Sequence, residues 1–133
     1  MRIRIVILIS FALMALLLLI RKPVSLNAQQ SEAGQQNPVK STPESEGRAR
    51  KLYGYDCAVC HGVKGDGKGD MSADFPGKIR DFTDPAALKD FTDEQLFTII
   101  KDGKGDMPPE GKRAKTNELW GLVNYVRSFS KKE

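Results

Sequence analysis

The chain has 133 residues, 21 basic and 17 acidic side chains, and a formal net charge of +4, which suits one small domain with appended segments. The excess of positive charge equals four residues near the start: Arg2, Arg4, Arg21 and Lys22. Beyond them the charges balance, so the sequence lacks the basic surface typical of nucleic-acid-binding proteins. We therefore expect no nucleic-acid partner.

Residues 1–28 predict an export segment. The run from Ile5 to Ile20 is apolar except for Ser10, and Ala28 offers a small residue at a cleavage point. As a helix the run spans ~24 Å, short of a ~30 Å hydrocarbon core, although flanking basic side chains can snorkel. Two interpretations stay open: a cleaved signal peptide, or a membrane anchor formed by residues 5–20. Both predict a periplasmic location or one at the extracytoplasmic face of the membrane.

Residues 29–46 predict a disordered linker. Gln, Ser, Pro and Glu dominate this segment, and Val39 is its only large apolar residue. The folded domain is predicted over residues 47–133.

The sequence of this domain predicts helices and no strand. Residues 44–58 contain strong helix formers, and a short helix is expected to begin at Asp84. A capping box at residues 92–95 begins another helix, which ends at Gly103. Residues 117–129 repeat apolar side chains at helical spacing. The predicted fold class is all-α: a small domain of three to four helices, preceded by the N-terminal apolar helix.

The motif Cys57-Ala58-Val59-Cys60-His61 contains the only cysteines and the only histidine of the chain. Two thiols one turn apart can each bond to a porphyrin vinyl group, and the histidine that follows is typical of c-type haem attachment. We predict one haem c per chain, bound through Cys57 and Cys60, with His61 as the proximal iron ligand. A zinc site needs about four ligands, and the chain offers only these three Cys and His residues. A thioredoxin-like redox pair needs a βαβ context, which the predicted helices do not provide. A structural disulfide remains the main alternative, although it would close a very short loop.

A methionine is the natural second axial ligand, because a soft thioether suits haem iron. Met107 follows the second main helix, where the chain has had room to cross to the opposite haem face. Pro108 and Pro109 stiffen its loop. Met71 follows His61 closely and would have to wrap around the haem edge. We predict Met107 as the distal iron ligand, with Met71 and an open iron as alternatives.

An ordered set of residues runs from the first predicted helix to the last: Gly47, Leu52-Tyr53, Cys57 to Gly62, Gly65-Asp66-Gly67, Arg80 to Asp84, Met107-Pro108, and Trp120 through Tyr125 to Arg127. This set resembles a class I cytochrome c, a mono-haem c-type cytochrome domain. The resemblance implies three main helices around one covalent haem, with Gly47 packed against Tyr125 where the first and last helices cross. It also implies Met107 as the distal ligand. Such domains often use a proline carbonyl to orient the proximal imidazole, and here Asp70 or a neighbour is expected in its place.

The predicted function is single-electron transfer between redox partner proteins, without enzymatic turnover, because the iron does the chemistry and the protein sets its ligation and docking. Two alternatives remain: a fixed cytochrome subunit of a larger membrane dehydrogenase or oxidase complex, and a haem-based sensor or ligand-binding protein. Arg80 and Trp120 are each expected to contact a haem propionate or to pack in the domain. Basic residues around the Met107 loop could steer an acidic partner, although acidic residues are interleaved with them. The basic residues are Lys101, Lys104, Lys112, Arg113 and Lys115.

Overall fold

The computed structural model describes residues 35–77 and 79–131. The predictions for the export segment and for residues 29–34 of the linker lie outside this part of the chain. None of the helices formed by the described residues is long and apolar enough to cross a membrane. In the same residues the structure is helices, turns and one isolated β-bridge between Lys104 and Met107, which confirms the all-α prediction.

The first helix, α2 (Pro43–Leu52), begins inside the segment that was predicted to be a disordered linker. Thr42 and Ser45 form a capping box: the Ser45 N–H donates to Thr42 Oγ1 at 3.2 Å, and the Thr42 N–H donates to Ser45 Oγ at 2.9 Å. Pro43 occupies the first turn, where its missing N–H costs nothing. The linker prediction is therefore wrong from Pro43 onward, because the Ser, Thr and Pro residues taken as low complexity are a helix start.

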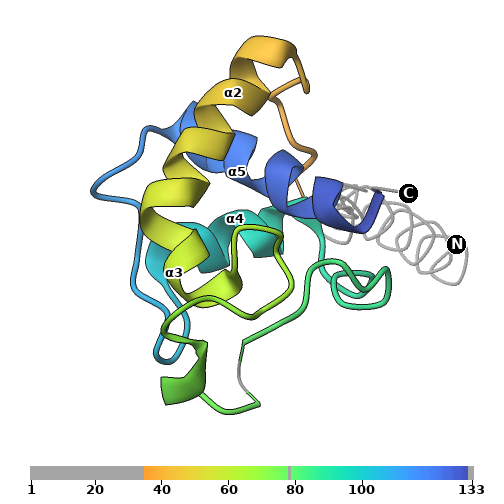
Figure 1. Ribbon diagram of the computed structural model, residues 1–133. Helices are drawn as coiled ribbons and strands as arrows, with labels where there is room; N and C mark the ends of the chain where they lie inside the picture. Colours follow the sequence, from red (N-terminus) through yellow and green to blue (C-terminus); the bar gives the residue numbers. More distant parts are fainter. Residues whose placement is uncertain (1–34, 78, 132–133) are drawn as a thin grey trace, which may run out of the picture. The chain divides into compact units, whose positions relative to one another are not determined.

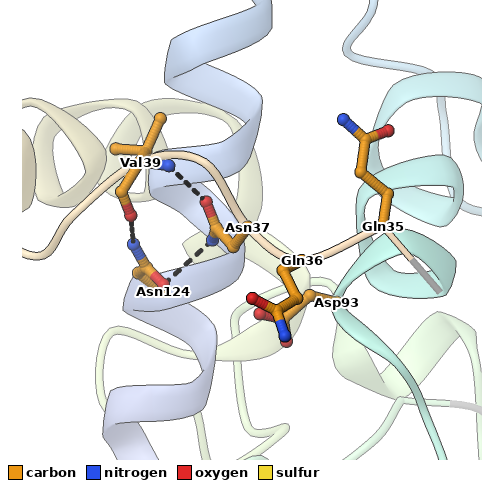
Figure 2. Close-up of a pocket in the computed structure, with 6 residues that line it drawn as sticks. All are labelled: Gln35, Gln36, Asn37, Val39, Asp93 and Asn124. Carbon is orange, nitrogen blue, oxygen red and sulfur yellow. Dashed lines mark hydrogen bonds between the residues drawn. The ribbon is translucent and has the colours of Figure 1, made fainter. Parts of the chain in front are cut away.

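Residues 35–42, also assigned to the linker, lie along the last helix, α5 (Thr116–Ser128). Asn37 Nδ2 donates to the Trp120 carbonyl at 3.0 Å and to Asn124 Oδ1 at 2.9 Å. Asn124 Nδ2 in turn donates to the Val39 carbonyl at 2.8 Å (Figure 2). We call residues 35–42 the strap: Asn37 and Val39 bond to α5, and the Gln35 N–H donates to Glu94 Oε2 at 2.9 Å.

Helical structure continues from α2 through η2 (Tyr53–Cys57), a single π-helical turn, into α3 (Ala58–His61) (Figure 1). Gly62 ends it with a φ of 75°, a left-handed conformation that favours glycine. A short 3-10 helix, η3 (Ser72–Asp74), follows. The prediction of one helix over residues 44–58 is confirmed in outline, with a π turn that ends at Cys57, the first residue of the cysteine motif.

The capping box at Thr92 begins α4 (Asp93–Asp102), and Gly103 ends it, as predicted. The short helix expected at Asp84 is absent, and residues 82–90 form turns and a bend instead. Asp84 Oδ1 accepts a 2.8 Å hydrogen bond from the Ala86 N–H. Such side-chain bonds to the local backbone compete with helix formation. α5 is followed by a last turn, η4 (Phe129–Lys131).

The core forms around α5, whose Val123 is 0% exposed. α4 packs on it through Phe97 and Trp120, whose stacked rings lie 4.2 Å apart between centroids. α2 crosses α5 (Figure 1). The buried side chains of α5 with the following turn are Leu119, Trp120, Leu122, Val123, Tyr125, Val126 and Phe129.

The implied contact between Gly47 and Tyr125 is wrong. Gly47 is exposed, and a Cβ added there would meet no atom within 4 Å. The helices instead approach at Ala49, which is 2% exposed, and at Gly121, where an added Cβ would lie 3.7 Å from the Ala49 Cβ. The Tyr125 ring meets Tyr53, the first residue of η2 and four residues after Ala49.

Candidate functional site

Cys57 and Cys60 are free thiols, each partly exposed, at the end of η2 and in α3. Burial, together with the nearby carboxylates of Glu110 and Asp56, raises the pKa of the Cys57 thiol to about 12. The two residues lie one turn apart, and both are free in the structure. The disulfide considered from the sequence is not formed.

His61 follows directly and stacks on Phe82, with ring centroids 4.7 Å apart and an interplanar angle of 19°. Its Nδ1 is buried and has no hydrogen bond of full geometry in the described structure. Burial lowers the pKa of His61, whereas the Arg80 backbone acts on the imidazole as an acceptor and raises it. Burial thus favours the neutral imidazole, the form that binds metals.

The backbone that faces His61 belongs to Arg80, and the expectation of Asp70 is wrong. Arg80 lies two residues before Phe82, whose N–H donates to the Gly65 carbonyl at 2.7 Å. A Cβ at Gly67 would lie 3.3 Å from the Arg80 carbonyl oxygen. The glycine-rich loop thus brings residues 80–82 back to the imidazole, a return that spacing in the sequence did not reveal.

That loop folds onto the cysteine motif itself. The Gly67 N–H donates to the His61 carbonyl at 2.9 Å, and the Gly69 N–H donates to the Cys60 carbonyl at 3.2 Å. At Gly69 an added Cβ would lie only 2.4 Å from the Val59 carbonyl oxygen. Glycine is therefore needed there for the close approach of two backbones.

The two candidate methionines lie on different elements. The Met71 N–H donates to the Val59 carbonyl at 2.9 Å, and the Met71 side chain is 44% exposed. Met107 is partly buried and packs against the core. It closes a turn with Lys104, in which each backbone N–H donates to the other residue's carbonyl at 3.1 Å. Met71 is thus bound to the segment that carries His61, whereas Met107 comes from the loop between α4 and α5.

The Met107 loop contains a buried carboxylate that sequence reasoning passed over. Glu110 is 4% exposed and receives two hydrogen bonds from Arg113: one from Nε to Oε2 at 3.2 Å and a shorter one from Nη2 to Oε1. Arg113 Nη1 also lies 3.3 Å from Asp56 Oδ1. In the sequence, only the three-residue spacing of Glu110 and Arg113 hinted at this pair.

Trp120 and Arg80 both make packing contacts in the described structure. Trp120 is 3% exposed and stacked on Phe97. Arg80 Nη1 donates to the Ala87 carbonyl at 2.8 Å, and its guanidinium lies 5.0 Å from the centroid of the Phe91 ring. Within the proposed basic group, Arg113 is engaged by Glu110 and Asp56, and Lys101 Nζ lies 3.7 Å from an Asp102 oxygen.

A surface hollow of about 410 Å³ lies elsewhere, beside the strap (Figure 2). Its walls are polar and include none of the cysteine, histidine or methionine residues of the site. The residues that line it are Gln35, Gln36, Asn37, Val39, Asp93 and Asn124.

The donor set fits a covalently bound haem. Two free thiols lie one turn apart, an imidazole with a buried Nδ1 follows them, and another loop offers a partly buried thioether. Thiols can form thioether bonds to vinyl groups, and imidazole and thioether are both ligands of haem iron.

Comparisons with known proteins also indicate a covalently bound haem. Residues 45–126 match the family model described as cytochrome c oxidase, cbb3-type, subunit III. None of the curated proteins compared matches the chain. The solved structure of the Kuenenia stuttgartiensis reducing HAO-like protein complex Kustc0457/Kustc0458 is similar, with 27% identity and a TM-score of 0.61 over 69% of this chain. The KustC0563 c-type cytochrome is 30% identical, with a TM-score of 0.54 over 61% of this chain. The alignment spans 46% of the first structure's chain and 95% of the second's.

Proposed function

Because this chain belongs to the cytochrome c family whose model is described as cbb3-type oxidase subunit III, we propose that it is a single-electron carrier with His/Met ligation of one haem. Haem c, bound covalently, is its cofactor, and haem-based electron transfer is its function at the level of the family. The finer proposal assigns Cys57 and Cys60 to the covalent attachment. His61 is the proximal ligand and Met107 the distal one.

The observation that supports Met107 is the separation of the two methionine loops. The backbone of Met71 is bonded to Val59, inside the cysteine motif, so Met71 stays with the segment that supplies His61. Met107 is held on the loop that follows α4 and packs against the core. Two ligands from opposite faces require two separate segments, and His61 with Met107 meets that requirement.

The side chains divide the work of the site. Haem iron supplies a one-electron couple, and His/Met ligation favours its reduced state. Phe82 stacks on His61 and limits rotation of the imidazole. With haem bound, His61 and Met107 would both ligate the iron, which would favour electron transfer over substrate turnover or ligand sensing.

Export is part of the proposal. The apolar run of residues 5–20 would bring the domain to the periplasm or the extracytoplasmic face of the membrane, as a cleaved signal or as an anchor.

A second candidate is a fixed subunit of a larger redox complex. The matching family model is described as an oxidase subunit, and the first similar structure is that of a protein complex. Purification in mild detergent from the native membrane distinguishes the two. A stoichiometric large partner would support the subunit, and an isolated cytochrome would support the free carrier.

The function is tested on full-length protein expressed in a host with haem-attachment machinery. Intact mass should report one haem per chain and show whether residues 1–28 remain. A redox titration should follow a one-electron curve, and the ferrous protein should bind carbon monoxide slowly at neutral pH. Rapid carbon monoxide binding would contradict ligation by Met107 and favour a sensor.

A further inference from the structure

Electron transfer itself gives no role to the carboxylate of Glu110. Its side chain is 5% exposed, and it is the buried charged residue of the described chain. Burial of a carboxylate is costly unless it is paired and hydrogen-bonded. The position of this charge therefore needs an explanation beyond general packing.

The pairing of Glu110 is made by a single guanidinium that also reaches a second acid. Arg113 donates to both Glu110 oxygens, the bidentate geometry that gives a carboxylate pair its directionality. Its third nitrogen, Nη1, lies 3.3 Å from Asp56 Oδ1, and the Asp56 side chain is 25% exposed. Glu110, Arg113 and Asp56 form one connected group, which we call the latch.

The latch joins two segments that are distant in the sequence. Asp56 lies in η2, immediately before Cys57. Glu110 lies on the Met107 loop, and charges of Glu110, Asp56 and Arg113 all act on the Cys57 thiol. The latch is therefore next to the first cysteine of the haem-attachment motif.

The backbone hydrogen bonds of Glu110 and Gly111 in the Met107 loop join it to α4 and not to the Cys57 turn. The Glu110 N–H donates to the Ile100 carbonyl at 3.0 Å, and the Gly111 N–H donates to the Lys101 carbonyl at 2.8 Å. These bonds tie the loop to the end of α4, which does not carry the cysteines. The latch adds a direct side-chain link between this loop and the cysteine-bearing turn.

We propose that the latch positions Met107 for iron ligation by fixing its loop against the Cys57 turn, with Glu110 and Arg113 as positioning residues. This inference rests on the proposed function, because it takes Met107 as the distal ligand. When the latch is broken, the loop stays attached to α4 but moves more freely relative to the Cys57 turn. The thioether then leaves the iron more often, and an external ligand can take its place.

The test uses the holoprotein and four variants: Glu110→Gln, Arg113→Gln, the double variant that combines these two substitutions, and Asp56→Asn. The readouts are the far-red absorption band of the Met–iron bond and the rate at which imidazole binds the ferric protein. We expect a weaker band and imidazole binding faster on the order of tenfold in Glu110→Gln and Arg113→Gln, with a smaller change in Asp56→Asn. Asp56→Asn is the more conservative variant and preserves the test if another does not fold.

The matched control is Arg127→Gln. Arg127 Nε lies 2.5 Å from Asp93 Oδ1 in a partly buried pair of α5 and α4 that includes no latch residue. It should lower thermal stability without accelerating imidazole binding. The double latch variant should be more stable than Arg113→Gln, because it leaves no unpaired buried charge, yet its imidazole binding should remain fast.

The outcomes separate the two proposals. A normal band in the unmodified protein with unchanged imidazole binding in every latch variant would overturn the latch alone. Equal acceleration in Arg127→Gln would also overturn it, because general destabilisation would then explain the effect. Absence of the band from the unmodified protein would overturn the proposed ligation and the latch with it.

Discussion

Tyr53 Oη donates a 2.8 Å hydrogen bond to the carbonyl of Gly62, the residue that follows His61. The Tyr53 ring is 2% exposed and packs against Tyr125 and Phe129, with centroids 5.3 and 5.1 Å away. One side chain therefore joins the start of the cysteine-bearing turn, the last helix and the end of the haem-attachment motif.

Replacement of Tyr53 by Phe should lower the free energy of unfolding of the holoprotein by about 1 kcal/mol at neutral pH, because the Gly62 carbonyl loses its donor. Burial raises the pKa of Tyr53 well above its usual 10.0. The folded protein therefore retains a proton that the unfolded chain releases, and stability contributed by Tyr53 is complete below about pH 10 and lost as the pH rises above it.

Denaturant titrations at neutral and alkaline pH check this prediction. The unmodified protein should lose more stability than Tyr53→Phe as the pH rises above about 10. Tyr55→Phe is the control, because Tyr55 is 83% exposed. Equal alkaline losses in Tyr53→Phe and the unmodified protein would refute the role of the buried phenol.

The crossing of α2 and α5 predicts opposite effects at two neighbouring positions. Gly47→Ala should raise the free energy of unfolding by up to about 1 kcal/mol, because the site is exposed and alanine favours helix. Ala49→Leu should lower it by about 1–3 kcal/mol, because Ala49 faces Gly121 at the crossing. Thermal unfolding of both holoproteins measures the difference. A destabilised Gly47→Ala would contradict the exposed position of Gly47 and favour the contact between Gly47 and Tyr125.

Gly69→Ala should weaken the glycine-rich loop. The added methyl group would meet the Val59 and Ala58 carbonyl oxygens at 2.4 and 2.5 Å, and backbone atoms cannot move aside cheaply. We expect a loss of about 1–3 kcal/mol and a lower yield of holoprotein. Gly54→Ala is the control, since a Cβ there meets nothing within 4 Å. Equal holoprotein yields, measured by haem absorbance per unit of polypeptide, would contradict the prediction.

The strap should depend on Asn124. Asn124→Ala removes the 2.8 Å bond to the Val39 carbonyl and the 2.9 Å bond from Asn37. Limited proteolysis should then cut within residues 35–42 faster than in the unmodified protein, because the freed backbone opens more often. Asn117→Ala, at an exposed position of the same helix, should leave the cleavage rate unchanged. Unaltered cleavage in Asn124→Ala would show that the strap is held by other contacts.

Local chemical signals explain which features the sequence predicted. The capping box at Thr92, the end of α4 at Gly103 and the apolar repeat of α5 are encoded within a few residues, and the structure confirms them. The Thr42 capping box is equally local, but it was obscured by a Gln-, Ser- and Pro-rich surrounding. The helix predicted to begin at Asp84 is absent, because an aspartate side chain that can cap a helix can also close a turn.

Long-range relations escaped the sequence. Arg80 reaches His61 only because the glycine-rich loop folds back, and Glu110 meets Asp56 only because Arg113 bridges two distant segments. Likewise, the position of the closest helix approach depends on which stripe of α2 faces α5, and a shift of two residues exchanges Gly47 for Ala49. Such features follow from the packed fold, which a pattern along the chain does not specify.

The proposed ligation by Met107 underlies both the proposed electron-carrier function and the latch, and the far-red absorption band of the Met–iron bond in the ferric holoprotein reports on it. Met107→Ala should abolish the band and open the ferrous iron to rapid carbon monoxide binding. Met71→Ala, a change at a 44% exposed side chain, should retain the band and the slow binding. A band that survives in Met107→Ala and disappears in Met71→Ala would contradict ligation by Met107 and make Met71 the ligand.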